Sequence, residues 1–383
     1  MTRKTAIVCT TIFEPAWMAG YLDNLRAHGR ERDTTLIVIG DRKTPATVWV
    51  AAEKARQDGF DVRCPTLDEQ VAYLKKIGAP DDFVPWNTDN RRNIGFLMAI
   101  EAGVDVMISI DDDNYCLADS DFVGTHHVVG GTAANAPGLQ TAGGANWFNI
   151  CSLLDSTTPA TVWARGFPYA LRKPEANPKL RAANAQEGGA TVAVNAGLWL
   201  DDPDVDALTR LALGPRMKKA HPGTVLLAPE TWSPVNTQNT ALIRAALPAY
   251  YYVRMGFALQ GMRIDRFGDI LSGYFVQKCA KHLGHGLTLG GPVAEHRRTP
   301  HNLFKDLYFE LAGIVLIEAL LPWMQELKLS GSNYAEAYAS LADALETQAP
   351  KFTGFVWDEG GREFLKETAA CMRTWLKLIR PFA

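Results

Sequence analysis

The chain has 383 residues, more than one ordinary domain requires, so we expect a large single domain or a domain with a substantial C-terminal extension. Hydrophobic residues make up 47% and charged residues 21% of the chain, which is typical of a globular protein and excludes the disordered and collagen-like classes. A formal net charge of −3 offers no broad basic surface for nucleic acid. We therefore expect a small-molecule partner.

Short β-branched runs alternate with helical stretches along the first 115 residues. We expect strands at 5–9, 35–39, 62–64 and 104–110, and helices at 14–28, 48–58, 67–77 and 91–102. Such alternation predicts a mostly parallel sheet with helices on both faces.

The pattern changes in the rest of the chain. Residues 130–144 are rich in Gly, Ala, Thr and Pro, which is typical of a surface loop, and shorter β-like runs follow from 145 to 227. After Asn302 we expect three helices, at 303–321 (ended by Pro322), 334–345 and 362–379. We predict a mixed α/β catalytic domain over 1–300 and a helical C-terminal extension over 301–383 that packs on it.

Three features favour a cytoplasmic protein without a membrane span. The six cysteines are scattered without a CxxC pair, which suits a reducing compartment. The N-terminal segment is typical of a first strand, because its apolar run is brief and no small-residue cleavage site follows. The most apolar stretch, 303–324, is interrupted by charged residues and Pro322.

Three consecutive carboxylates, Asp111, Asp112 and Asp113, follow the expected strand at 104–110. Ligands of open α/β sheets bind outside the carboxyl ends of the strands, where this triplet emerges. A divalent cation that bridges diphosphate oxygens would neutralise the repulsion between the carboxylates. We expect Mn²⁺ or Mg²⁺ on Asp111 and Asp113, with Asp112 facing the sugar or ribose; the alternative is a solvated turn whose acids cap a helix.

Other candidates have an ordinary structural alternative of similar weight. Asp41 ends the second strand and suits a ribose hydroxyl or a base N–H, or else an Asx turn before Pro45. Arg91 and Arg92 open a helix and reach phosphates from there, or form an exposed pair.

Two further candidates lie later in the chain. His296 follows a Gly-Gly turn and suits a nitrogen ligand beside the metal, although a lone histidine is more often structural. Asp269 precedes an apolar helix, which favours an N-cap, and it could also orient a substrate hydroxyl or act as a base.

Taken together, these blocks resemble the reversibly glycosylated polypeptides, which are the UDP-arabinopyranose mutases of plants. Ile110–Tyr115 (IDDDNY) is similar to that family's Ile-Asp-Asp-Asp, and Arg92–Phe96 to its Arg-x-x-Gly-Tyr helix. Ala164–Arg172 (ARGFPYALR) resembles its Val-Arg-Gly-Tyr-Pro-Phe-Ser-Leu-Arg segment, and Asn195–Thr209 its Gly-Leu-Trp-Leu block. The likeness runs in collinear order over roughly residues 5 to 345.

The resemblance implies a GT-A-like, Rossmann-like nucleotide-sugar fold with a metal on Asp111 and Asp113 and with His296 as a further ligand. In the family an arginine is reversibly glycosylated, and the matching residue is Arg165. Arg172 matches a second family arginine, and the two could clamp a departing UDP. On this interpretation the catalytic residues are Arg165, Arg172, Asp112 and Asp269, and the nucleotide lies against Thr11, Asp41, Arg92 and Asp111.

The resemblance favours a metal-dependent UDP-sugar mutase that interconverts pyranose and furanose forms and glycosylates its own arginine. Two departures keep alternatives open: Phe13 stands where the family has an arginine, and Gly268 stands where it has an aspartate. The first alternative is a GT-A glycosyltransferase that moves a sugar from a UDP-sugar to a small-molecule or protein acceptor. The second is a noncatalytic UDP-sugar-binding partner. A homo-oligomer is compatible with each.

Overall fold

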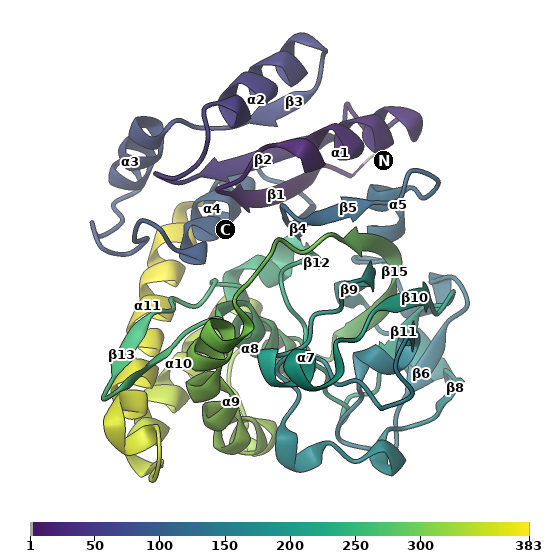
Figure 1. The fold of residues 1–383 in the computed structure, drawn as a ribbon, viewed down its shortest axis with the longest axis vertical. Coiled ribbons are helices and arrows are strands. Elements are labelled where there is room, and N and C mark those ends of the chain that lie inside the picture. The colour runs from purple at the N-terminus through teal and green to yellow at the C-terminus, as the bar shows by residue number, and fades with distance from the viewer. Residues whose placement is uncertain (1–2, 383) are drawn as a thin grey trace.

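The first strands of the chain form the parallel half of a central sheet. The computed structural model describes residues 3–382. The strands β1, β2, β3 and β4 lie in the order β3-β2-β1-β4 and are all parallel (Figure 1). Their bounds are Thr5–Thr11, Thr34–Gly40, Asp61–Arg63 and Val106–Asp111. The connecting helices α1 to α4 span Ala16–Ala27, Thr47–Gln57, Leu67–Lys76 and Arg92–Glu101.

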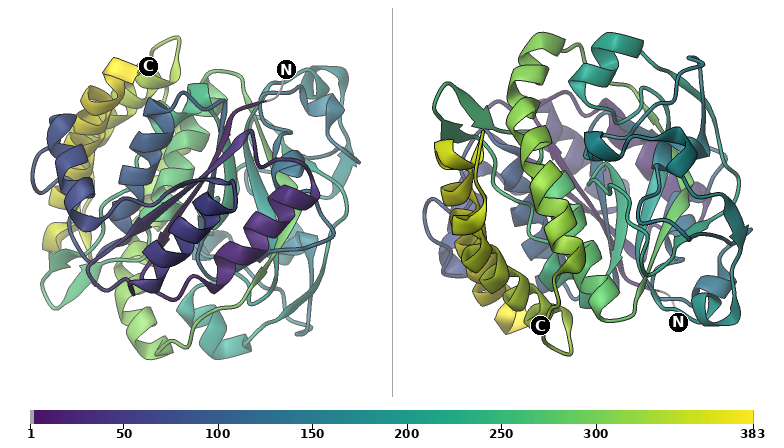
Figure 2. Two further views of the ribbon diagram at one scale, coloured as in Figure 1. Left: turned by 90° about the horizontal axis from the view of Figure 1, so that it is seen from above. Right: turned by 90° about the horizontal axis from the view of Figure 1, so that it is seen from below.

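Alternate residues of these strands face opposite sides of the sheet, as strand geometry requires. Ile7 packs in one cluster with Trp17 of α1 and Val48 of α2. Val8 packs in a second cluster with Ile94 of α4 and with the C-terminal helices. Seen from above, α1 and α2 cover one face, and seen from below, α9 and α11 cover the other (Figure 2).

The second half of the sheet is mixed. Strand β12 (Asn239–Ile243) joins it antiparallel to β4, and β9 (Val192–Asp201) and β15 (Gly286–His296) follow, parallel to each other. The remaining strands are β5 Asn114–Cys116, β6 Gln140–Ala142, β7 Leu154–Ser156, β8 Leu180–Ala182, β10 Met217–Ala220 and β11 Val225–Leu227. A separate hairpin joins β13 (Phe257–Leu259) and β14 (Met262–Ile264). The predicted α/β class with a mixed central sheet is confirmed.

Helices dominate the C-terminal part, also as predicted. The helices after the short α5 (Phe122–His126), α6 (Ala185–Gly188) and α7 (Ala207–Leu213) are α8 Gly268–His282, α9 Leu303–Glu326, α10 Tyr334–Gln348 and α11 Arg362–Ile379. Leu320, Tyr338 and Trp375, one from each of the last three, belong to the same buried cluster as α4 and α8. The helical region therefore covers one face of the sheet.

Two boundary predictions are wrong. The predicted loop at 130–144 contains β6, whose Thr141 and Ala142 are fully buried between β11 and β8. Strand β6 is only three residues long, so the sequence shows no alternation of polar and apolar residues from which the strand could be predicted. Pro322 does not end α9, because the helix continues to Glu326 and buries Met324.

Helix α9 is, among residues 3–382, the one helix long and apolar enough to cross a membrane on length and composition alone. Half of its most apolar stretch is buried inside the protein. Its buried Glu310 also pairs with Arg266, with Oε1 3.0 Å from Nε. These contacts describe a helix that packs on the rest of the chain.

Helix α8 packs so closely against the loop before β12 that it requires a glycine at position 273. A Cβ at this position would lie 1.8 Å from the carbonyl oxygen of Val235, and backbone cannot easily move away. We expect Gly273→Ala to lower the free energy of unfolding by about 3 kcal/mol or more, the upper end for overpacking. Urea unfolding measures it.

Gly20 supplies the matched control, because it lies exposed within α1 and a Cβ added there would meet nothing within 4 Å. Gly20→Ala should stabilise the helix by roughly 0.5–1 kcal/mol. Equal effects of the two substitutions would contradict this account of the α8 packing.

Candidate functional site

A cavity of about 350 Å³ opens at the carboxyl ends of the parallel strands. The register pairs Thr10 with Asp111 and Thr11 with Gly40, so the ends of β1, β2 and β4 meet at one edge of the sheet. The residues predicted from the sequence that line it are Thr11, Asp41, Arg91, Arg92, Asp111, Asp112, Asp113, Arg165, Asp269 and His296. One predicted site residue, Arg172, is not among the lining residues.

Asp111 is held by a buried arginine below it. Arg92 donates from Nη2 to Asp111 Oδ1 at 2.5 Å and from Nη1 to the carbonyl oxygen of Ile110 at 2.8 Å. Burial raises the pKa of Asp111 to about 6, although the charge of Arg92 lowers it. Arg92 therefore orients the carboxylate of Asp111 and holds the end of β4 in place. Because both of its Nη groups donate to the protein, it is poorly placed to bind a nucleotide as predicted.

Asp112 is oriented by the end of β1. Thr11 donates from Oγ1 to Asp112 Oδ2 at 2.5 Å. Burial raises the pKa of Asp112 to about 7, against the hydrogen bond from Thr11. Thr11 is 3% exposed, so its observed role is to position Asp112 at the cavity.

Asp113 and His296 face each other across the third position of the triplet. Strand β5 pairs with the end of β15, which brings His296 opposite Asn114 and its Nε2 to 3.2 Å from Asp113 Oδ2. The other ring nitrogen, Nδ1, lies 2.6 Å from the carbonyl oxygen of Asp202. A carbonyl only accepts, so Nδ1 donates to it, and Nε2 is the ring nitrogen that faces the carboxylate.

Nε2 of His296 and Oδ2 of Asp113, 3.2 Å apart, can share a proton or bind one cation, and the second arrangement fits a metal. A histidine whose Nδ1–H is fixed by a backbone carbonyl is the usual arrangement of a metal ligand. One nitrogen and one carboxylate favour Mn²⁺ over Mg²⁺, which prefers oxygen alone. Within residues 3–382, however, no group of three or more His, Cys, Asp or Glu side chains is gathered as a metal centre. A cation would draw its remaining ligands from water or substrate.

Arg165 lies in the wall of the cavity between two carboxylates. It donates from Nε and Nη2 to Asp204 at 2.8 and 3.2 Å, and from Nη1 and Nη2 to Asp269 at 3.0 and 2.5 Å. Nη1 also donates to the carbonyl oxygen of Arg266 at 2.5 Å. All five N–H groups are used, so Arg165 has none free to clamp a diphosphate.

The predicted placement of Arg172 in a clamp with Arg165 is wrong. Arg172 donates from Nη2 to Asp206 at 2.6 Å and lies over the ring of Tyr169, 3.5 Å from its centroid. Arg165 pairs with Asp204 and Asp269, whereas Arg172 pairs with Asp206, so the two guanidinium groups are held by different carboxylates. Arg172 fixes this segment.

Asp269 and Asp41 also differ from the simplest predictions. Asp269 is not the N-cap of α8, since Phe267 occupies that position, and its carboxylate in the first turn holds Arg165. Asp41 accepts the backbone N–H of Arg42 and of Asn87, both at 2.6 Å, which ties β2 to the loop before α4. Asp41 remains 5% exposed at the cavity wall.

Sequence reasoning missed a group of cations in the same cavity. They are Lys43, Arg266 and Arg298, and His301 lies in the same lining. Arg298 donates to Asp306 at 3.0 Å, and its buried Nε has no hydrogen-bond partner among residues 3–382. Arg298 and His301 come directly after the end of β15 at His296. Their position after a strand could have indicated from the sequence that they lie near the site.

The carboxylate triplet should make stability depend on pH. The pKa of Asp112 is about 7 in the folded chain and about 3.9 in an unfolded one, so the folded state holds the extra proton between these values. Stability from this group therefore falls as the pH rises through that window. In EDTA, wild type should lose more stability than Asp112→Asn between pH 5 and pH 8, measured by urea unfolding. Parallel profiles for the two proteins would contradict this.

The fold and cavity define an α/β protein with an acidic ligand site at the carboxyl edge of its parallel strands. The model of the family described as "Reversibly glycosylated polypeptide" matches residues 7–381. The chain belongs to this family, as the resemblance predicted, and the match includes the C-terminal helices.

Curated relatives are distant in sequence. UDP-arabinopyranose mutase 1 of Arabidopsis thaliana is 29% identical over 297 residues, which cover 77% of this chain and 73% of the relative. UDP-arabinopyranose mutase 1 of Oryza sativa subsp. japonica is 26% identical over 346 residues, covering 89% of this chain and 82% of the relative.

Two solved structures are similar to this chain at low identity. Glucosyl-3-phosphoglycerate synthase from Mycobacterium tuberculosis, in complex with phosphoglyceric acid, has 12% identity and a TM-score of 0.39, covering 86% of this chain and 82% of that one. S. aureus TarS 1-349 in complex with UDP has 11% identity and a TM-score of 0.36, covering 93% and 74%. TM-scores this low carry no weight for function.

Proposed function

We propose that the protein is a metal-dependent UDP-sugar mutase that interconverts ring forms of the sugar and carries it transiently on Arg165. The observation that carries this proposal is the position of Arg165, which lies in the same cavity as the acidic triplet and is held between two carboxylates. Family membership and the mutase relatives support it.

The two carboxylates keep Arg165 a cation, and they are also the proton acceptors that it needs in order to react as a nucleophile. Burial lowers the pKa of Arg165, but Asp204 and Asp269 raise it well above the ordinary value, so the side chain does not lose its proton beforehand. As a guanidinium nitrogen bonds to C1 and the bond from C1 to the UDP oxygen breaks, an N–H proton passes to the carboxylate that already accepts it. Glycosylated Arg165 keeps its single positive charge, and UDP leaves with the electron pair.

The other side of the cavity would handle the diphosphate. A divalent cation on Asp113 and His296 would neutralise charge on the leaving group, which is the usual contribution of a metal in such transfers. Arg298, with its unpartnered Nε, is the cation best placed to donate to a phosphate oxygen. Asp41, at the cavity wall after β2, would face the ribose.

Chromatography of UDP-pentoses and UDP-hexoses after incubation with the protein and Mn²⁺ tests the mutase reaction. We expect one UDP-sugar to equilibrate between pyranose and furanose forms without net release of UDP. The Arg165→Lys variant keeps the charge but loses the fork that both carboxylates hold, and should abolish the conversion. An unchanged ring form in every UDP-sugar would contradict the proposal.

A glycosyltransferase is the second candidate, because the structure closes one position that the family uses. At Gly268, a Cβ would lie 2.5 Å from the carbonyl oxygen of Val253, so the aspartate expected from the family would not fit without movement of α8. At the cavity mouth, Phe13 is 47% exposed where the family has an arginine. UDP release that requires a sugar acceptor, with no ring isomerisation, would favour the transferase.

A further inference from the structure

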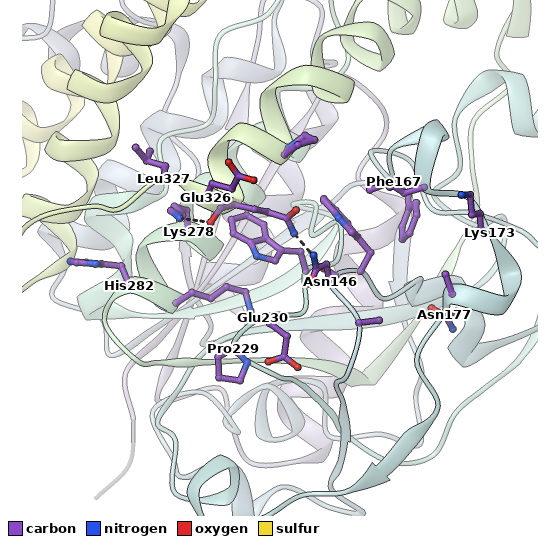
Figure 3. Close-up of a pocket in the computed structure, with 18 of the residues that line it drawn as sticks. Asn146, Phe167, Lys173, Asn177, Pro229, Glu230, Lys278, His282, Glu326 and Leu327 are labelled. Carbon is purple, nitrogen blue, oxygen red and sulfur yellow. Dashed lines mark hydrogen bonds between the residues drawn. The ribbon is translucent and has the colours of Figure 1, made fainter.

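A second and larger cavity, of about 1060 Å³, shares no lining residue with the nucleotide-sugar cavity. It lies between the later part of α8, the end of α9 and the loops around Trp147 and Trp232. In Figure 3, Lys278 and His282 lie on one side of it and Phe167, Lys173 and Asn177 on the other. Its size is at the upper end of the roughly 300–1,000 Å³ that ligand pockets occupy.

The floor of this cavity is aromatic. Trp147, Trp163, Phe167 and Trp232 line it, and each is less than 9% exposed. Side-chain amides of Asn146, Asn177 and Gln325 lie among the lining residues. Aromatic surface with nearby amides suits the apolar faces and hydroxyl groups of a sugar ring.

Two lysines of α8 lie beside the aromatic floor, and the other charged residues that line the cavity are Lys173, Lys328, Glu230 and Glu326. The ammonium groups of Lys278 and Lys281 each lie 5.9 Å from the centre of the Trp232 ring. Lys278 donates to the carbonyl oxygen of Gln325 at 3.2 Å, and Lys281 to that of Ala228 at 3.0 Å. An ammonium group has three N–H donors, and each lysine uses one of them in this bond to a backbone carbonyl. The remaining donors are available to a ligand.

Neither lysine has a carboxylate partner. Among the described residues no ion pair is formed by Lys278 or Lys281, although Lys278 is 7% exposed. The carboxylate of Glu230, which also lines the cavity, instead accepts the backbone N–H of Gly144 at 3.0 Å. Burial lowers the pKa of Lys281 to about 7, although the charge of Glu230 raises it, and a buried cation without a paired carboxylate is costly. An anionic ligand would supply the missing charge.

We propose that this cavity binds an anionic sugar, with its phosphate or carboxylate on Lys278 and Lys281 and its ring over the aromatic floor. This cavity is separate from the nucleotide-sugar cavity, but residues of the same chain segment and of the same helix line both. The segment Trp163–Phe167 sends Trp163 and Phe167 to this cavity and Arg165 to the other. Along α8, Asp269 and Lys278 are nine residues apart, which is about 14 Å.

Calorimetric titration of the full-length protein with Mn²⁺, carried out without UDP and again with saturating UDP to fill the first site, tests this proposal. The probes are glucose 1-phosphate and glucuronate, with glucose and inorganic phosphate as the neutral and ring-free comparisons. We expect at least one anionic sugar to bind at least tenfold more tightly than glucose and than phosphate. Which of the two binds distinguishes a phosphate from a carboxylate ligand.

Variants locate the binding. Lys278→Gln should weaken it at least tenfold, and Lys281→Gln serves in the same way if the first variant does not fold. Lys366→Gln, an exposed lysine of α11 that lines neither cavity, should leave it unchanged. The proposal is overturned if neither anionic sugar binds, if phosphate alone binds as tightly, if UDP prevents binding, or if neither cavity variant weakens it.

Discussion

Arg165→Met is expected to lower the free energy of unfolding by about 3–5 kcal/mol, because it leaves two buried carboxylates without their cation. The side chains of Asp204 and Asp269 are 6% and 8% exposed, and Arg165 donates two hydrogen bonds to each. Urea unfolding at pH 7 measures the loss. This effect is independent of any reaction at the site.

Arg373 provides a matched control on the surface. It also bridges two carboxylates, Asp343 and Glu346, but these side chains are 70% and 53% exposed. Arg373→Met should cost less than about 1 kcal/mol, since solvent screens such pairs. Adding Asp269→Asn to Arg165→Met should restore part of the stability. Similar losses at both arginines would show that burial of the Arg165 carboxylates does not matter.

Asp113→Asn is expected to weaken Mn²⁺-dependent binding of UDP by about 100-fold or more. Loss of residues that only orient a metal ligand typically costs 10–100-fold, and we propose Asp113, which lies opposite Nε2 of His296, as a ligand itself. Titration of UDP with and without Mn²⁺ measures the effect. Wild type in EDTA should behave like the variant in Mn²⁺.

The exposed Asp81, which does not line the cavity, supplies the control for this substitution. Asp81→Asn should bind UDP with wild-type affinity in Mn²⁺. Tight, Mn²⁺-dependent binding by Asp113→Asn would remove Asp113 from the metal site.

Local sequence patterns were sufficient for the parallel half of the fold and for the carboxylates at its edge. Runs of β-branched residues marked the strands, and parallel strands have their carboxyl ends at the same edge of a sheet. Asp41 and Asp111, which follow two of these strands, could therefore be predicted to lie at one edge. The course of α9 through Pro322 could not, because packing of Met324 outweighs the helix-breaking tendency of proline.

The partners of the site residues depend on tertiary contacts that no local pattern encodes. Asp204 meets Arg165 across 39 positions of sequence, and Asp269 meets it across 104. The resemblance placed Arg165 and Arg172 together, but only Arg165 lines the cavity, because Arg172 pairs with Asp206. Arg298 was missed because its significance lies in an unpartnered nitrogen, which only the folded chain reveals.

The most direct test of the central proposal is the mass of the intact protein after incubation with Mn²⁺ and each UDP-sugar, followed by peptide mapping. The account predicts a gain of one sugar on Arg165, absent from Arg165→Lys and retained by Arg172→Lys, whose side chain lies outside the cavity. Excess UDP should remove the sugar and regenerate the UDP-sugar. Ring isomerisation without any adduct, or an adduct on another residue, would contradict a covalent role for Arg165.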